Sequence, residues 1–150
     1  MTIEIKPRIG LNNLNFGVSM PDVEKFLGKP QEIARIDEME EHKSIVWHYW
    51  SSGFSAFFDD NANGKFSCAE IDNKKALLWD QEIFLLTEKE IVKLFNKKGF
   101  KEIEIEQQKW GERRVSFDDA LVDLYFESEK LISVNFSMPV VQNKIVFFPN

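Results

Sequence analysis

The chain lacks the features that mark secreted, membrane and nucleic-acid-binding proteins. It has one cysteine in 150 residues, Cys68, which excludes an internal disulfide and is typical of the reducing cytosol. No run approaches the roughly 18 apolar residues of a membrane-spanning helix, and residues 1–8 lack the apolar stretch of a secretory signal. Acidic side chains (25) outnumber basic ones (19), so phosphate-backbone binding is disfavoured. We therefore predict a cytoplasmic protein that binds neither membrane nor nucleic acid.

Groups of residues that carry out catalysis are also scarce. The two histidines, His42 and His48, have no cysteine or second carboxylate at metal-ligand spacing. No serine lies in a nucleophile-elbow motif and no glycine-rich phosphate loop occurs. Cys68 falls inside a predicted strand, where a small buried thiol is the usual interpretation. The sequence therefore predicts a protein that is not an enzyme and needs no cofactor.

An internal repeat is the main feature that the chain does have. Under a shift of 68 positions, residues 16–19 align with 84–87 and residues 57–59 align with 125–127, with similar residue types. A repeat of this length indicates two supersecondary units that complete one core together. We therefore predict a single domain, 1–150, with repeats at about 10–76 and 77–148.

Each repeat opens with a predicted helix. Ser19 and Thr87 are hydroxyl residues with an acid three positions later, the pattern of a helix N-cap. Apolar residues then recur at helical spacing, and Gly28 and Gly99 mark the two ends. The predicted stripes are Val23, Phe26 and Leu27 in the first helix and Ile91, Leu94 and Phe95 in the second.

Short alternating runs follow each helix and predict antiparallel strands joined by polar turns. The runs of the first repeat are 32–36, 45–50, 54–59 and 65–71; those of the second are 101–106, 113–117, 121–127 and 130–136, with a last run at 144–148. The expected fold is α+β: two tandem helix-plus-antiparallel-meander repeats that form one curved sheet, with the helices on one face.

The first helix also carries a family pattern. Gly17, Ser19, Val23, the pair Leu27–Gly28 and Pro30 match the form Gly-x-Ser-x-x-x-Val-x-x-x-Leu-Gly-x-Pro. With the strand Trp47-His48-Tyr49, this resembles the tandem repeats of the β-lactamase-inhibitor-protein type and the related outer-membrane-assembly lipoprotein. The resemblance implies a curved sheet that binds another protein.

One segment matches the twelve-residue calcium loop of helix–loop–helix proteins. Asp59, Asn61, Asn63 and Glu70 occupy ligand positions, and Gly64 stands at the bend. Against this, residues 53–58 read as a strand, and Asn63-Gly64 is a strong hairpin signal. We favour a hairpin turn, and no metal site is favoured.

The first repeat also carries aromatic and acidic residues that the second lacks. Trp47, Tyr49 and Trp50 are interpreted either as core residues or as an aromatic anchor patch for a partner. The segment 37–41 carries four acids, Asp37, Glu38, Glu40 and Glu41, either as a solvated connector or as a cover for a basic cleft. These seven residues are the predicted partner-binding set.

Two functions fit this sequence. The first is a cytoplasmic immunity protein that binds a basic protein partner, such as a toxin domain, and occludes its active site. The alternative is a carrier or sensor of a small apolar ligand, with a pocket between sheet and helices.

Overall fold

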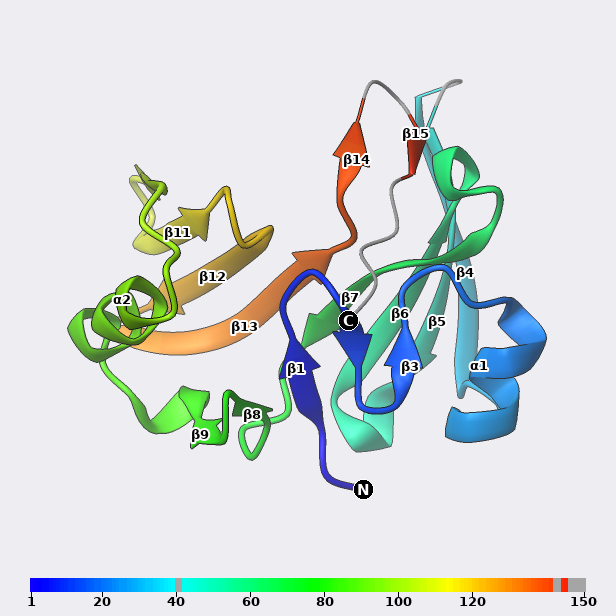
Figure 1. Ribbon diagram of the computed structural model, residues 1–150, viewed down its shortest axis with the longest axis horizontal. Coiled ribbons are helices and arrows are strands. Elements are labelled where there is room, and N and C mark those ends of the chain that lie inside the picture. Colours follow the sequence, from blue (N-terminus) through cyan, green and yellow to red (C-terminus); the bar gives the residue numbers. More distant parts are fainter. Residues whose placement is uncertain (40–41, 142–143, 146–150) are drawn as a thin grey trace.

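The chain folds as the α+β protein that the sequence predicts. The computed structural model describes residues 1–39, 42–141 and 144–145, with side chains placed in 1–36 and 43–139 (Figure 1). Within these residues, two α-helices lie among many short strands, which form an eight-stranded, a five-stranded and a two-stranded sheet.

The eight-stranded sheet is antiparallel throughout and has the order β10-β11-β12-β13-β7-β6-β5-β4. Four strands come from each half of the chain, and the halves meet where β13 pairs with β7. The first four are β4 (Glu32–Met39), β5 (His42–Tyr49), β6 (Phe54–Asp59) and β7 (Lys65–Ile71). The others are β10 (Ile103–Gln107), β11 (Glu112–Phe117), β12 (Val122–Glu127) and β13 (Lys130–Ser137).

The prediction of one sheet built from two helix-plus-meander repeats is wrong, because segments outside the predicted strands form a second sheet. Its order is β3-β2-β1-β8-β9. The bounds are β1 Glu4–Lys6, β2 Gly10–Leu11, β3 Leu14–Asn15, β8 Leu77–Leu78 and β9 Gln81–Glu82. β1 and β8 pair in parallel, so the N-terminal segment lies beside the segment that connects the halves. Two-residue strands with little periodicity leave no alternating pattern to detect.

The last predicted strand is described in part. β15 (Lys144–Ile145) pairs with β14 (Val140–Val141) in the two-stranded sheet. Residues 146–148 of the predicted run lie outside the described residues.

Both helices start where their caps predict. α1 (Met20–Leu27) is capped by Ser19, whose Oγ accepts from the Asp22 amide at 3.3 Å. α2 (Glu88–Lys97) has the complete reciprocal box between Thr87 and Glu90. One stripe residue is predicted wrongly: Phe26 is 59% exposed, because the short α1 buries only Val23 fully.

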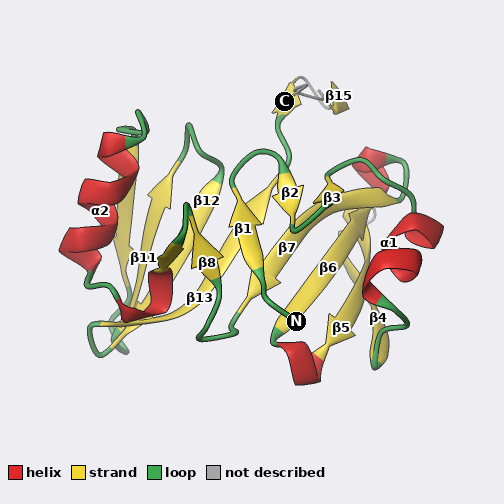
Figure 2. Ribbon diagram, turned by 60° about the horizontal axis from the view of Figure 1, so that its bottom comes forward, coloured by secondary structure: helices red, strands yellow, loops and turns green. Residues whose placement is uncertain are grey.

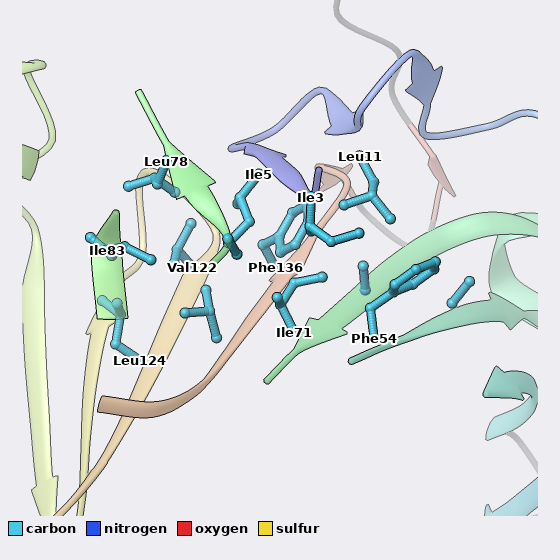
Figure 3. Packing of buried hydrophobic residues seen from close by; sticks show 14 of the residues in the cluster. Ile3, Ile5, Leu11, Phe54, Ile71, Leu78, Ile83, Val122, Leu124 and Phe136 are labelled. Atoms are coloured by element: carbon cyan, nitrogen blue, oxygen red, sulfur yellow. The ribbon is translucent and has the colours of Figure 1, made fainter. Parts of the chain in front are cut away.

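The core lies on one face of the eight-stranded sheet, beneath the small sheet and the two helices (Figure 2). Ile3 and Ile5 of the N-terminal segment lie near Phe136 of β13, with Leu11 on one side and Leu78 of β8 on the other (Figure 3). At the α2 end, the rings of Phe95 and Phe117 stack with centroids 4.3 Å apart. The small sheet therefore covers the centre of the large one, and each helix covers an end.

The described part of the chain also contains three 3₁₀ turns: Trp50–Ser52, Asp60–Ala62 and Ile83–Leu85. The first ends at Gly53, where the backbone has φ 73° and a Cβ would lie 2.8 Å from that of Asn73. Only glycine combines this conformation with this close approach.

Candidate functional site

The strand register separates the large sheet into a core face and an opposite outer face. Directly paired residues lie on the same face, so the register can be followed from strand to strand. On the outer face it links one residue of each strand into a continuous line. This polar row comprises Glu32, His48, Ser55, Glu70, Asn135, Asp123, Ser116 and Glu104. Neighbouring strands lie roughly 4.8 Å apart, so the row extends over roughly 34 Å.

An aromatic stack lies at the β4 end of the row. The rings of His48 and Trp50 stack with centroids 4.0 Å apart and 11° between their planes. His48 Nδ1 lies 2.7 Å from the hydroxyl of Ser55, and Trp50 Nε1 donates to Glu32 Oε1 at 3.2 Å. Trp50 remains 56% exposed. This end therefore presents a flat apolar ring, held in place by its neighbours, beside a carboxylate.

An acidic cluster around one cation lies at the β10 end. Arg114 donates to Glu106 Oε2 at 2.9 Å and lies 3.9 Å from Glu104 and 3.8 Å from Asp123. Ser116 accepts from Arg114 and donates to Asp123 Oδ1 at 2.5 Å. Three carboxylates around one guanidinium leave the cluster net negative.

The centre of the row holds an acid whose charge is disfavoured. Partial burial, and then the nearby Asp72, raise the pKa of Glu70, while His48 lowers it. The Cys68 thiol beside it donates to Asn135 Oδ1 at 3.0 Å. Burial, together with the charges of Asp59, Glu70 and Asp123, raises the pKa of that thiol far above its usual range. A thiol kept protonated in this way is a poor nucleophile.

Two of the predicted partner-binding aromatics are core residues. Trp47 and Tyr49 are 7% and 5% exposed, because their register partners Ala56 and Phe54 face the core. The Tyr49 hydroxyl donates to the Gly28 carbonyl at 2.9 Å, which ties β5 to the end of α1. Burial, and then the charge of Glu24, raise the pKa of Tyr49 to about 12. Their interpretation as partner-contacting residues is therefore corrected.

The predicted acidic connector is a strand extension. Asp37 and Glu38 belong to β4, which runs on to Met39, and Glu40 and Glu41 lie outside the described residues. β4 begins beside Trp50, and a strand advances roughly 3.3 Å per residue, so Met39 lies roughly 23 Å from Glu32. The aromatic patch and the acidic segment are thus at opposite ends of one strand.

The calcium-loop match folds as a hairpin. Asp60–Ala62 form a 3₁₀ turn, Asn63 is left-handed with φ 56°, and Asp59 pairs with Lys65 across the hairpin. Glu70 pairs with Ser55, four residues from Asp59, which places it roughly 13 Å along the strand. Asp59 instead accepts hydrogen bonds from Ser44 and Ser67. The residues of the weak calcium-loop match, Asp59, Asn61, Asn63 and Glu70, therefore do not surround one point.

Several residues of the outer face were not predicted as a site: Glu32, Ser55, Asn135, Asp123, Ser116, Glu104 and Arg114. Alternation in each strand assigns them to a polar face, which is a usable signal. The missing information is the register, above all across β13 and β7, whose pairing joins residues about 65 positions apart.

Comparison with known proteins gave no match to a family model, a curated protein or a solved structure. The resemblance to the inhibitor-type repeats therefore remains a prediction. No helix among the described residues is long and apolar enough to cross a membrane. Within residues 1–39, 42–141 and 144–145, no three His, Cys, Asp or Glu side chains group in a way that could hold a metal ion.

Proposed function

We propose that this protein binds a basic surface of another protein through the outer face of its eight-stranded sheet. The polar row is the observation that carries the proposal. It puts Glu32, Glu70 and Glu104 at the surface across the full width of the sheet. Arg114, which lies beside the row on β11, is already engaged by carboxylates. A face of this charge attracts lysine and arginine side chains and speeds their encounter.

The dimensions fit a protein interface better than a small ligand. A row roughly 34 Å long, with two or three outward residues on each strand, covers an area of several hundred Å². Stable interfaces bury about 800 Å² on each partner. Exposed tryptophan is a frequent interface hot spot, and Trp50 lies at one end of the row beside His48.

The specific form of the proposal is a cytoplasmic immunity protein for a basic toxin. Its carboxylates would stand where a nuclease binds substrate phosphates, and the sheet would block access to the active site. The resemblance of residues 17–30 and 47–49 to an inhibitor scaffold supports this form.

The carrier alternative is less well supported. It requires an apolar pocket between the sheet and its helices, but the groove of about 660 Å³ between α2 and the sheet is lined mainly by polar and charged residues, among them Thr87, Glu88 and Arg113. Elsewhere in the described part of the chain, aromatic rings occupy the layer between the sheet and the helices. Phe95 stacks on Phe117 at 4.3 Å, and Phe16 packs on Phe66 at 5.0 Å.

Site-specific photo-crosslinking in the source cell tests the binding face. A photoreactive phenylalanine derivative replaces Tyr125, which is half-buried on the outer face opposite Arg114. The control position is Leu85, which is 72% exposed and follows the small sheet. We expect one basic protein to be crosslinked from position 125 and not from position 85. Equal crosslinking from both positions, or an acidic partner, would contradict the proposal.

Co-expression tests the immunity form. A gene product that arrests growth alone should be neutralised when this protein is present. The double variant Glu32→Lys and Glu70→Lys should lose neutralisation at unchanged fold, and the complex should weaken as salt rises. If the crosslinked partner is not toxic, binding stands and the immunity role fails.

A further inference from the structure

The edge strand β10 carries one end of the polar row, Glu104, and it also has a backbone edge that the inner strands of the sheet lack. β11 pairs with one side of β10, and no strand of the described chain pairs with the other. All five of its residues, Ile103–Gln107, are exposed. An unpaired edge of this kind is a template for another strand unless its side chains prevent pairing.

Hydrogen bonds at the two ends of β10 show which backbone groups are turned outward. The Asp118 amide donates to the Glu102 carbonyl at 3.0 Å, and the Gln108 amide donates to the Glu112 carbonyl at 2.7 Å. In an antiparallel ladder the residues that bond a given neighbour alternate. The even-numbered residues therefore bond β11, and the amides and carbonyls of Ile103, Ile105 and Gln107 point away from it.

The side chains of β10 differ sharply between the two faces. Ile103 and Ile105 pair with Phe117 and Val115 and so lie on the core face. They remain 42% and 46% exposed at its margin. Glu104 and Glu106 lie on the outer face and share one cation, Arg114. An added strand would meet apolar surface on one face and excess negative charge on the other.

A second copy of this chain is a poor occupant of the edge. A register that sets Ile103 or Ile105 of one copy opposite Ile105 of the other places Glu104 opposite Glu104 or Glu106 of the second copy. Like charges on directly opposite strands are destabilising. Pairing between two copies of β10 is therefore disfavoured, but the edge can still accept a strand of opposite charge.

We propose that β10 is a docking edge for an extended segment of a partner protein in which lysine or arginine alternates with valine or isoleucine. Its backbone would bond the outward groups of Ile103, Ile105 and Gln107. The basic side chains would face Glu104 and Glu106, and the β-branched ones would cover the two isoleucines. This is strand addition that is selective for basic side chains.

The surroundings leave room for such a segment to continue. Gln107, the last residue of β10, helps line a groove of about 660 Å³ with Glu88, Arg113 and Phe126. The far edge, β4, offers a natural comparison: its central outer-face residues Ala34 and Ile36 are apolar. β4 has no matching acidic pair there, so it should not select a basic strand.

Amide hydrogen exchange by NMR tests the proposal with a defined probe, a blocked seven-residue peptide of alternating lysine and valine. The control peptide has glutamate in place of lysine. We expect the lysine peptide to slow exchange at the amides of Ile103, Ile105 and Gln107 by about tenfold or more. Slowing of this size is expected when most of the protein has the peptide bound. The glutamate peptide should leave these rates unchanged.

Variants at the edge separate strand addition from general charge attraction. Ile105→Pro removes an outward amide without breaking a bond to β11, a position where edge strands tolerate proline. Ile105→Val is its matched control. Affinity for the lysine peptide should fall about tenfold or more in the proline variant, equivalent to about 1.4 kcal/mol, and stay near wild type in the valine variant.

A charge-reversed protein keeps the test decisive if the proline variant does not fold. The double variant Glu104→Lys and Glu106→Lys should bind the glutamate peptide in preference to the lysine peptide. The glutamate peptide should then slow amide hydrogen exchange at β10. Equal effects of both peptides, or protection at β4 in place of β10, would overturn the proposal. Concentration-dependent dimers that Ile105→Pro abolishes would overturn it as well, in favour of a second copy.

Discussion

In the strands β11, β12 and β13, the two faces of the eight-stranded sheet carry opposite kinds of residue along the polar row. On the core face, Phe117, Val122 and Phe136 are almost fully buried beneath the small sheet and the helices. On the outer face, their sequence neighbours Ser116, Asp123 and Asn135 form part of the polar row. Under the proposed function, stability and recognition depend on alternate residues, and a substitution should affect one far more than the other.

Removing a core-face ring should have the largest effect. Phe117→Ala deletes a fully buried ring that stacks on Phe95, and large-to-small changes of this kind cost about 3–5 kcal/mol. Urea denaturation followed by circular dichroism measures the loss. The matched outer-face change Tyr125→Ala should cost less than half as much. Similar losses would mean that the faces do not differ as described.

A backbone change at Gly53 should come next. Ala at this position combines a left-handed φ of 73° with a Cβ contact of 2.8 Å to Asn73, and such strain costs roughly 1–3 kcal/mol. Thermal unfolding should register the loss. Gly64→Ala is the control: it has a similar φ of 71° but open space around its Cβ, so the difference between the two isolates the steric part.

Substitutions of the neighbouring aromatics Tyr49, which is buried, and Trp50, which is exposed, should show a smaller difference in stability. Tyr49→Phe removes the hydrogen bond to the Gly28 carbonyl and should cost about 1 kcal/mol of unfolding free energy. Trp50→Phe should change stability by less than about 0.5 kcal/mol because the ring is exposed. If crosslinking identifies a partner, affinity should show the reverse order. A Tyr49 variant that binds worse than a Trp50 variant would contradict this assignment.

The contribution of Glu70 to the pH dependence of stability should be the smallest of these effects. Its folded pKa is raised, so the folded state binds the proton more tightly than the unfolded state does. Its contribution to stability is complete below the ordinary glutamate pKa and is lost as the pH rises through the raised one. Glu70→Gln should remove this loss. The melting temperature of the variant should therefore rise relative to that of the wild type as the pH increases from the ordinary glutamate pKa through the raised one. A constant difference at all pH values would contradict the shift.

Local sequence signals predicted the elements well, because each depends on nearby residues. The N-caps Ser19 and Thr87 mark the helix starts, and the run 54–59 coincides with β6. Long-range pairing was not predictable in the same way. The small sheet consists of strands of two or three residues, and nothing in residues 4–6 specifies that they pair with residues 77–78.

The candidate site was predictable only in pieces for the same reason. Alternation assigns Glu70 and Asp123 to polar faces, but their membership in one row depends on the register between β7 and β13. The roles of Trp47 and Trp50 were open because both are large aromatics near the end of one strand. Parity within β5 decides them: Trp47 faces the core, and the chain turns at Trp50.

The parallel pairing of β1 with β8 has a consequence for synthesis on the ribosome. Ile5 is made well before its register partner Leu78, and the Leu77 amide donates to the Ile3 carbonyl at 2.8 Å. The N-terminal strand therefore cannot reach its final place until the whole first half and the following connector have emerged. The strand β1 leaves the exit tunnel before the partner that holds it in place, and its Ile5 stays uncovered by β8 in the interval.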